Sequence, residues 1–247
     1  MGRIDVERMD VERIDCELDE ASGTGPAVGL VVLQSDEVLE RELRAWLPDA
    51  FRLLHSRIAN DAHVSADTLR AMERDLPAAA RLLPAGVDFD VVAYGCTSAS
   101  TVIGEARVAE LLGEAVPGAV ATNPITALRA RLADLGVSRI ALLTPYSPDV
   151  TRAVVELLER GGIEVRRSAT FDEPDDRRVA RIAERSTLEA LVRLGGHDDC
   201  DAVFGSCTNL RALGILAEAE RRLGKPVLTS NAALAWHVER LCEDRLR

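Results

Sequence analysis

The sequence contains no long hydrophobic run. Its uninterrupted apolar stretches are far shorter than the roughly 20 residues that a membrane-spanning helix needs. The N-terminal stretch MGRIDVERMDVERIDCELDE carries charges throughout and has no apolar core of the kind found in secretory signals. We therefore predict no membrane segment and no secretion, and we expect the protein in the cytoplasm.

Positive charge is scarce as well. The chain has 30 Lys and Arg residues against 41 Asp and Glu residues, which gives a formal net charge of -11. Nucleic-acid binding needs clustered Lys and Arg to neutralise phosphates, so this balance argues against a nucleic-acid partner. Small anionic substrates stay open, because backbone N–H groups at helix N-termini bind anions locally.

The ligand pattern of a structural metal is missing too. No CxxC pair and no cluster of His and Cys has zinc-ligand spacing, so we expect no metal. An odd and scattered set of cysteines in a chain of this length indicates free thiols in a reducing compartment. The five cysteines are Cys16, Cys96, Cys200, Cys207 and Cys242.

The composition that remains is globular, with 47% hydrophobic and 29% charged residues. A length of 247 residues allows one or two domains with a real core. The first 25 residues stand apart, because DVERMD at 5–10 and DVERID at 10–15 form a short degenerate repeat. We predict that residues 1–25 form a solvated, flexible tail.

From residue 26 onward, short apolar stretches alternate with longer stretches of helical periodicity. The predicted helices include 99–113, 176–196 and 209–224. This alternation predicts an α/β fold with parallel sheets, whose ligands lie at the carboxyl ends of the strands. The predicted strands cover 27–33, 51–58, 89–96, 119–123, 139–146, 164–171, 201–207 and 226–230.

An internal repeat divides this alternating region. A shift of 111 positions carries Cys96 onto Cys207 and DFDVVAYGCTS onto DCDAVFGSCTN. The same shift places Gly29 on Ile140, so that GLVVLQSDEV overlies IALLTPYSPDV. Matches in the same order along the chain indicate two similar α/β units.

The repeat predicts two pseudosymmetric Rossmann-like lobes, each with a parallel four-stranded sheet and with the active site in the cleft between them. Lobe 1 is predicted to comprise residues 26–120 plus 232–247, and lobe 2 residues 121–231. With a gap of three, ATNPITAL overlies TSNAALAW, which pairs Asn123 with Asn231 as expected helix N-caps.

Each lobe contributes one cysteine from the end of an equivalent strand. A thiol at a strand-to-helix junction faces the positive end of the helix, which predicts a lowered pKa for Cys96 and Cys207. The residues that follow them can hold a substrate carboxylate or a developing enolate together with backbone N–H groups. These residues are Thr97, Ser98, Thr208 and Asn209.

Two opposed thiols suit chemistry on both faces of one carbon. One thiol can remove a proton while the other supplies one, or one can add covalently while the other donates a proton. A single cysteine in a sequence is most often a buried small hydrophobe. The matching contexts of Cys96 and Cys207 favour function, whereas Cys16, Cys200 and Cys242 have no such context.

Several motifs resemble one family. YGCTSAS, SCTNLRAL, LLTPY, DDRRVARI and SNAALAWH together resemble the aspartate/glutamate racemase superfamily over roughly residues 27–242. The most similar branch is the maleate cis-trans isomerase and ectoine-utilisation group, to which arylmalonate decarboxylase is related. The resemblance implies two lobes, no cofactor, no metal and catalytic roles for Cys96 and Cys207. The decarboxylases keep only the second cysteine, so the pair here argues against that activity.

The resemblance also implies substrate-binding residues. Tyr146 in LLTPY resembles the family tyrosine that donates to a substrate carboxylate, with a packing role as the alternative. Gln34 falls where the isomerases carry a carboxylate-binding Asn, with a helix-start role as the alternative. Asp176 falls where they carry another amide, although it also suits the start of a helix.

An ionised Asp176 would repel a carboxylate and attract an ammonium group. We therefore predict a cofactor-independent isomerase or racemase of a small carboxylate that bears an amine, in the breakdown of ectoine or a related amino-acid derivative. The alternatives are a maleate cis-trans isomerase and a non-catalytic module that binds small carboxylates. The resemblance and the general frequency of twofold oligomers lead us to expect a homodimer.

Overall fold

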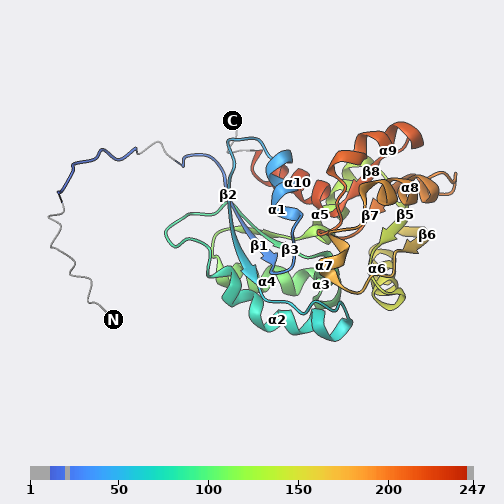
Figure 1. Cartoon of the computed structure of the whole chain (residues 1–247), viewed down its shortest axis with the longest axis horizontal. Helices are drawn as coiled ribbons and strands as arrows, with labels where there is room; N and C mark the ends of the chain where they lie inside the picture. Colours follow the sequence, from blue (N-terminus) through green and yellow to red (C-terminus); the bar gives the residue numbers. More distant parts are fainter. Residues whose placement is uncertain (1–11, 20–22, 244–247) are drawn as a thin grey trace, which may run out of the picture.

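The computed structural model describes residues 12–19 and 23–243, and it contains two four-stranded parallel sheets (Figure 1). The first sheet has the order β2-β1-β3-β4 and the second β6-β5-β7-β8, so the two sheets share one topology. The predicted α/β fold with two pseudosymmetric lobes is confirmed. The strands are β1 (Ala27–Leu33), β2 (Arg52–Ile58), β3 (Val91–Gly95), β4 (Val120–Thr122), β5 (Arg139–Thr144), β6 (Glu164–Thr170), β7 (Ala202–Gly205) and β8 (Val227–Thr229).

The middle strands of both sheets are buried except for Arg139 at the start of β5, and the edge strand β8 is buried as well. Every residue of β1, β3 and β7 is buried, whereas the edge strand β6 is mostly exposed or half-buried. Parallel strands covered by helices on both faces read as continuous apolar runs, which is why these strands were legible in the sequence. Of the two catalytic candidates, Cys96 directly follows the buried strand β3, and Cys207 follows the buried strand β7 after one intervening residue.

The helices begin and end at recognisable signals. Asn123 caps α5 by accepting hydrogen bonds from the backbone N–H groups of Ile125 and Thr126, and Gly136 ends it with a φ of 66°. Ser65 caps α2 through a capping box. The helices are α1 (Leu39–Trp46), α2 (Ala66–Ala80), α3 (Thr97–Ile103), α4 (Glu105–Ala115), α5 (Pro124–Leu135), α6 (Pro148–Arg160), α7 (Asp176–Val179), α8 (Glu184–Gly195), the 3₁₀ turn η1 (Leu213–Ile215), α9 (Leu216–Leu223) and α10 (Ser230–Leu241).

Three predicted helices are shorter or broken. The helix expected at 99–113 is split into α3 and α4 at Gly104, whose φ of 96° no right-handed helix accommodates. The helix expected at 176–196 is split into α7 and α8. The one expected at 209–224 begins only at η1, because the buried carboxylate of Glu42 binds the backbone N–H groups at its start.

One helix crosses to the other lobe. α10 follows β8 but packs on α1 and α5, and its Leu234 belongs to the core cluster of β1 and β3. The division into lobes at residues 26–120 plus 232–247 and 121–231 stays a prediction.

The strand register shows that the alignment of β1 with β5 in the internal repeat is wrong by one residue. Val28 pairs with Val91 in the first sheet, and Ile140 pairs with Ala202 in the second. Because the cysteine alignment superposes Val91 on Ala202, Ile140 corresponds to Val28 and the predicted match with Gly29 is wrong. The apolar runs of β1 and β5 are too uniform to fix their register by sequence alone.

The predicted pairing of Asn123 with Asn231 is also wrong. Asn123 is the N-cap of α5, but the corresponding N-cap of α10 is Thr229, which accepts a hydrogen bond from the Ala232 N–H. Asn231 lies inside the first turn of α10, and its side chain donates to Glu42 and to the Thr208 carbonyl. Its role is to join the two lobes.

Residues 12–19 have no regular structure (Figure 1). All of them are exposed. The remainder of the predicted tail at 1–11 and 20–22 lies outside the described residues. None of the helices within the described ranges is both long and apolar enough to cross a membrane.

Candidate active site

The loops that follow β3 and β7 meet between the lobes. The Ser230 hydroxyl accepts hydrogen bonds from the backbone N–H of Cys207 at 3.0 Å and from the Thr97 hydroxyl at 2.8 Å. The Thr208 hydroxyl donates to the Gly95 carbonyl at 3.2 Å. The predicted meeting of the two strand ends is thereby held by direct hydrogen bonds between the lobes.

One small cavity lies at this junction and both thiols line it. Its volume is about 20 Å³, which is room for about one water molecule. All the candidate site residues line it except Gln34 and Asn209. The lining residues are Leu33, Asn60, Asp61, His63, Val64, Thr68, Leu69, Met72, Cys96, Thr97, Ser98, Tyr146, Asp176, Cys207 and Thr208.

Cys96 occupies the N-cap of α3. Its Sγ accepts the backbone N–H of Ala99 at 3.4 Å and lies 3.6 Å from the Ser98 hydroxyl. Burial nevertheless raises the pKa of the Cys96 thiol to about 12, and the nearby carboxyls of Asp176 and Asp36 add to the rise. The predicted lowering of this pKa is wrong, because desolvation of the thiolate exceeds the effect of the helix N-terminus.

Cys207 stands in a different backbone setting. Its φ is 152°, a positive value that residues other than glycine rarely adopt, and no helix begins directly after it. The Tyr146 hydroxyl and the backbone N–H of Asn209 lie near its thiol and favour its ionised form. Burial still raises the pKa of Cys207 well above its usual value, and the Asp176 carboxyl raises it further, so the lowered pKa predicted here is wrong too.

Asp176 presents a buried carboxyl to the same cavity. Only 4% of the residue is exposed, and its Oδ2 accepts hydrogen bonds from the Ser35 hydroxyl and, at 3.3 Å, from the Asn209 amide. The Asn209 amide also donates to the Asp176 carbonyl at 2.8 Å. Burial raises the pKa of Asp176 although these hydrogen bonds oppose the rise. Asn209 therefore holds Asp176 in place and does not line the cavity.

Two loops from different lobes form a roof over the cavity. The backbone N–H of Val64 donates to the Pro174 carbonyl, and that of Asp176 donates to the Ala62 carbonyl, both at 2.9 Å. Between them His63 and Asp175 form an isolated antiparallel bridge. The loops follow β2 and β6, which are equivalent strands, so the roof repeats the pseudosymmetry of the thiols.

Gln34 is not brought to the cavity. The residue is exposed, and its backbone N–H donates to the Ile58 carbonyl at the end of β2. The amide that lines the cavity belongs to Asn60, which donates to the Ser35 hydroxyl at 2.8 Å. Asn60 follows the carboxyl end of β2, so the rule that ligands lie at strand ends would have found it in the sequence.

Two buried carboxyls near the site were not predicted. Asp36 accepts the backbone N–H groups of Val38 and Leu39 at 2.8 Å each, and burial raises its pKa to about 6. Glu42 is 1% exposed and accepts backbone N–H groups of the second lobe as well as the Asn231 amide at 2.8 Å. Both lie on the segment from β1 into α1, where the pattern predicts Ser35 or Asp36 as a helix cap and gives Glu42 no role beyond the helix surface.

The described part of the chain contains no group of three or more His, Cys, Asp or Glu side chains arranged to hold a metal ion. The side chains at the site carry thiols, carboxyls, hydroxyls and amides. These groups converge at the carboxyl ends of two parallel sheets, which defines a two-lobed α/β enzyme with a pair of cysteines between the lobes.

Comparison with known proteins identifies the class. The family profile of arylmalonate decarboxylase matches residues 62–247. The maleate isomerase of Geobacillus stearothermophilus is 27% identical over 225 residues, or 85% of this chain and 89% of the relative. The maleate isomerase of Nocardia farcinica is 30% identical over 227 residues, or 86% of this chain and 88% of the relative.

A solved structure agrees in fold. A mutant of Nocardia farcinica maleate cis-trans isomerase with a covalently bound succinylcysteine intermediate superposes with a TM-score of 0.79 at 27% identity, covering 88% of this chain and 93% of that one. The chain belongs to the family of arylmalonate decarboxylase and the maleate isomerases. The resemblance drawn from the motifs and the prediction of an enzyme are confirmed.

Proposed function

We propose that the protein is a cofactor-independent isomerase or racemase that holds a small carboxylate between Cys96 and Cys207. The observation that carries the proposal is that the two thiols come from equivalent strand ends and line one cavity. Hydroxyls of Ser98, Thr208 and Tyr146 line the same cavity and would bind the carboxylate oxygens.

The two thiols would take different first roles. Cys96 caps α3 and receives the Ala99 N–H, so its thiolate is the better stabilised one and would act as base or nucleophile. Cys207 has no helix behind it, and a protonated thiol there would act as the acid. In a racemisation, the Cys96 thiolate takes the α-proton from one face and the enolate takes a proton from Cys207 on the other. The product leaves Cys96 protonated and Cys207 ionised.

Maleate cis-trans isomerisation is the second candidate, and it is supported about as well by the named relatives. The Nocardia structure with its succinylcysteine supports covalent addition by a family cysteine. On this chain the Cys96 thiolate would add to one alkene carbon, and the electron pair of the double bond would pass to the other carbon next to its carboxylate. Rotation about the resulting single bond and expulsion of the thiolate would give the trans isomer.

The charge of the cavity favours a substrate that carries a hydrogen-bond donor such as an ammonium group. Asp176 faces the cavity, and among the residues that the structure describes no Lys or Arg lines it to offset a second substrate carboxylate. The Asp176 carboxyl also raises the pKa of both thiols. An ammonium group beside Asp176 would relieve that repulsion and make thiolate formation easier once substrate is bound. An ectoine-derived amino acid has this chemistry, so we keep that class as the preferred substrate.

The test is proton NMR in deuterated water. Wild type, Cys96→Ser, Cys207→Ser and the control Cys200→Ser would be incubated with maleate, N-acetyl-diaminobutyrate, aspartate and glutamate. Deuterium that enters one α-carbon with wild type and the control but not with Cys96→Ser, together with isomerisation that is lost in both site variants, supports two-thiol proton transfer. Conversion of maleate to fumarate would instead favour the second candidate. Absence of turnover on the whole panel would contradict both and favour the non-catalytic binding module.

Two further predictions, on the oligomeric state and the cellular location, need experiments of their own. A homodimer and a cytoplasmic location are proposals that sedimentation and cell fractionation would test. A carboxylate-binding module without catalysis is separated from an enzyme by thiol alkylation. The paired thiols of an enzyme should react faster when a bound substrate analogue promotes their ionisation, whereas a binder would only shield them.

A further inference from the structure

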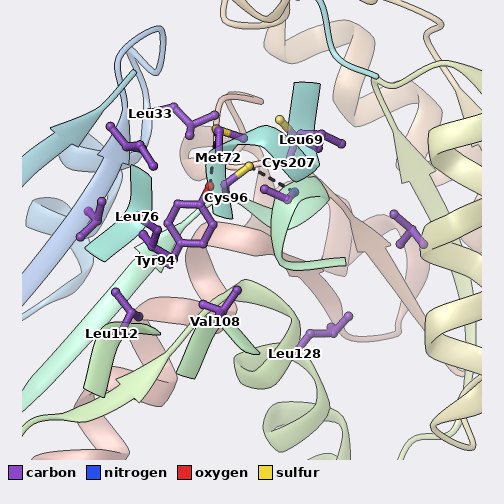
Figure 2. Packing of buried hydrophobic residues seen from close by; sticks show 14 of the residues in the cluster. Leu33, Leu69, Met72, Leu76, Tyr94, Cys96, Val108, Leu112, Leu128 and Cys207 are labelled. Atoms are coloured by element: carbon purple, nitrogen blue, oxygen red, sulfur yellow. Dashed lines mark hydrogen bonds between the residues drawn. The ribbon is translucent and has the colours of Figure 1, made fainter. Parts of the chain in front are cut away.

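The chain has two tyrosines, and each is placed beside one of the two cavity thiols. Tyr146 lines the cavity together with Cys207. Tyr94 lies beside Cys96 in the same core cluster (Figure 2) and was not singled out by the sequence. Figure 2 shows the Tyr94 ring beside Cys96, with its hydroxyl turned toward the sulfur of Met72.

The geometry of Tyr94 follows from its place in β3. It precedes Cys96 by two positions on an extended strand, so the two side chains point to the same face of the sheet. Tyr94 is fully buried and does not line the cavity, so it touches Cys96 but not a substrate. Its hydroxyl donates to the Met72 Sδ at 3.6 Å, and a thioether is a weak acceptor that leaves this donor available to a stronger one.

The fold itself does not require a tyrosine at this position. The residue that corresponds to Tyr94 in the second lobe is Gly205, two positions before Cys207 in β7. The Tyr146 hydroxyl comes instead from the loop after β5. A tyrosine therefore lies near each thiol but comes from a different element, which points to a shared requirement of the thiols and not to inherited symmetry.

We infer that Tyr94 is a positioning residue for Cys96, whose buried hydroxyl donates to the sulfur and stabilises the thiolate. A buried thiolate lacks water donors, and a hydrogen bond to a charged acceptor is about twice as strong as a neutral one. Burial raises the pKa of Tyr94 itself well above its usual value, so the hydroxyl keeps its proton and stays a donor. The inference rests on the proposed function only in making the Cys96 thiolate the reactive species.

The test removes the hydroxyl and keeps the ring. In Tyr94→Phe, the rate of iodoacetamide alkylation would be followed against pH, and modified peptides would be quantified separately for Cys96 and Cys207. We expect alkylation of Cys96 to be about tenfold slower below its pKa, equivalent to a rise of roughly one pH unit in its titration, with Cys207 unchanged within about twofold. No substrate is needed, so this result is independent of the proposed function.

A packing control separates the hydroxyl from the ring. Leu76 is buried in the same core cluster and does not line the cavity, so Leu76→Val loosens the packing while Tyr94 is kept. We expect this control to keep the Cys96 profile. The inference is overturned if Leu76→Val slows Cys96 as much as Tyr94→Phe does, if both thiols slow equally in Tyr94→Phe, or if Cys96 reacts as fast as in wild type or faster.

An activity measurement adds a second readout once a substrate is known. Tyr94→Phe should lower kcat about tenfold with little change in KM, because the hydroxyl acts on the thiolate and not on the substrate. The optimum of its pH profile should move to higher pH. A change confined to KM would contradict the inference, whereas failure to find any substrate would count against the proposed function alone.

Discussion

The two thiol loops share a scaffold but not a local structure. After β3 the chain turns directly into α3, with Cys96 as its N-cap. After β7 the chain passes through Cys207 with a φ of 152° and runs on without a helix until η1. The repeated fold places two thiols at equivalent positions, and the local differences are the basis of the unequal roles as base and acid that we propose for them.

The carboxyls around the thiols are also unequally shared between the lobes. Glu42 comes from the first lobe and binds backbone N–H groups on the segment that follows Cys207, whereas Asp36 binds N–H groups within its own lobe. Asp176 comes from the second lobe and is bound by the Ser35 hydroxyl of the first. Each lobe thus contributes hydrogen bonds that hold residues of the other lobe in place at the site.

The largest expected effect comes from replacing each thiol in turn, because the two variants should lose different activities. Cys96→Ser should lose both isomerisation and solvent exchange of the substrate proton, by roughly a thousandfold. Cys207→Ser should lose isomerisation by a similar factor but retain exchange on the face that Cys96 serves. Deuterium uptake followed by NMR would separate the two activities. Identical exchange in the two variants would contradict the unequal roles.

The second effect concerns stability against pH. Burial raises the pKa of Asp36 from 3.8 to about 6, so the folded state holds this proton more tightly than the unfolded state. The stability that this contributes is full below the unfolded pKa and is lost as pH rises through about 6.

Because Asn mimics the protonated acid, Asp36→Asn should lack this loss, which is on the order of 3 kcal/mol. Urea unfolding of both proteins between about pH 4 and pH 7 measures the difference in slope. Parallel stability curves for the variant and wild type would show that Asp36 does not titrate in this window.

A smaller effect tests the contact between α1 and the segment after β7. Glu42→Gln keeps the side-chain shape but turns one acceptor oxygen into a donor that faces other donors. Unfolding free energy should fall by about 2 kcal/mol. Glu156→Gln on the exposed face of α6 is the matched control and should change it by less than about 0.5 kcal/mol. Equal changes in the two variants would show that the contacts of Glu42 between the lobes do not contribute to stability.

The smallest effect sharpens the electrostatic comparison. Asp176→Asn removes a charge that raises the pKa of both thiols, so each should be alkylated about tenfold faster near neutral pH. Affinity for an amine-bearing carboxylate should fall and that for maleate should rise. Asp175→Asn makes the same charge change on a side chain that pairs with Arg177 outside the cavity. Equal acceleration in both variants would mean that only net charge matters.

Much of the site could be predicted from the sequence because its residues lie just after the carboxyl ends of buried strands. Cys96, Thr97, Ser98 and Cys207 follow buried strands, and strand ends meet at one edge of a parallel sheet. Asn60 obeys the same rule but carried no family motif, and Gln34 matched the motif but faces solvent. Motif position alone therefore did not decide which side chain reaches the cavity.

The thiol pKa shows where local reasoning fails. Sequence indicated the helix that follows Cys96, and that helix is present with Ala99 donating to the sulfur. The depth of burial and the nearness of Asp176 and Asp36 come from segments far apart in the chain, and they raise the pKa instead of lowering it. No pattern within one segment contains that information.

By itself, the sequence determined the α/β alternation, the two repeated lobes and the pairing of Cys96 with Cys207, because these depend on short-range periodicity and strand ends. Tertiary structure decided the register of the repeat, the loss of the helix after Cys207 and the roof over the cavity. These depend on backbone hydrogen bonds and buried carboxyls contributed across lobes, where Glu42 displaces a local helix start. Long-range desolvation and hydrogen bonding outweigh local propensity at those points.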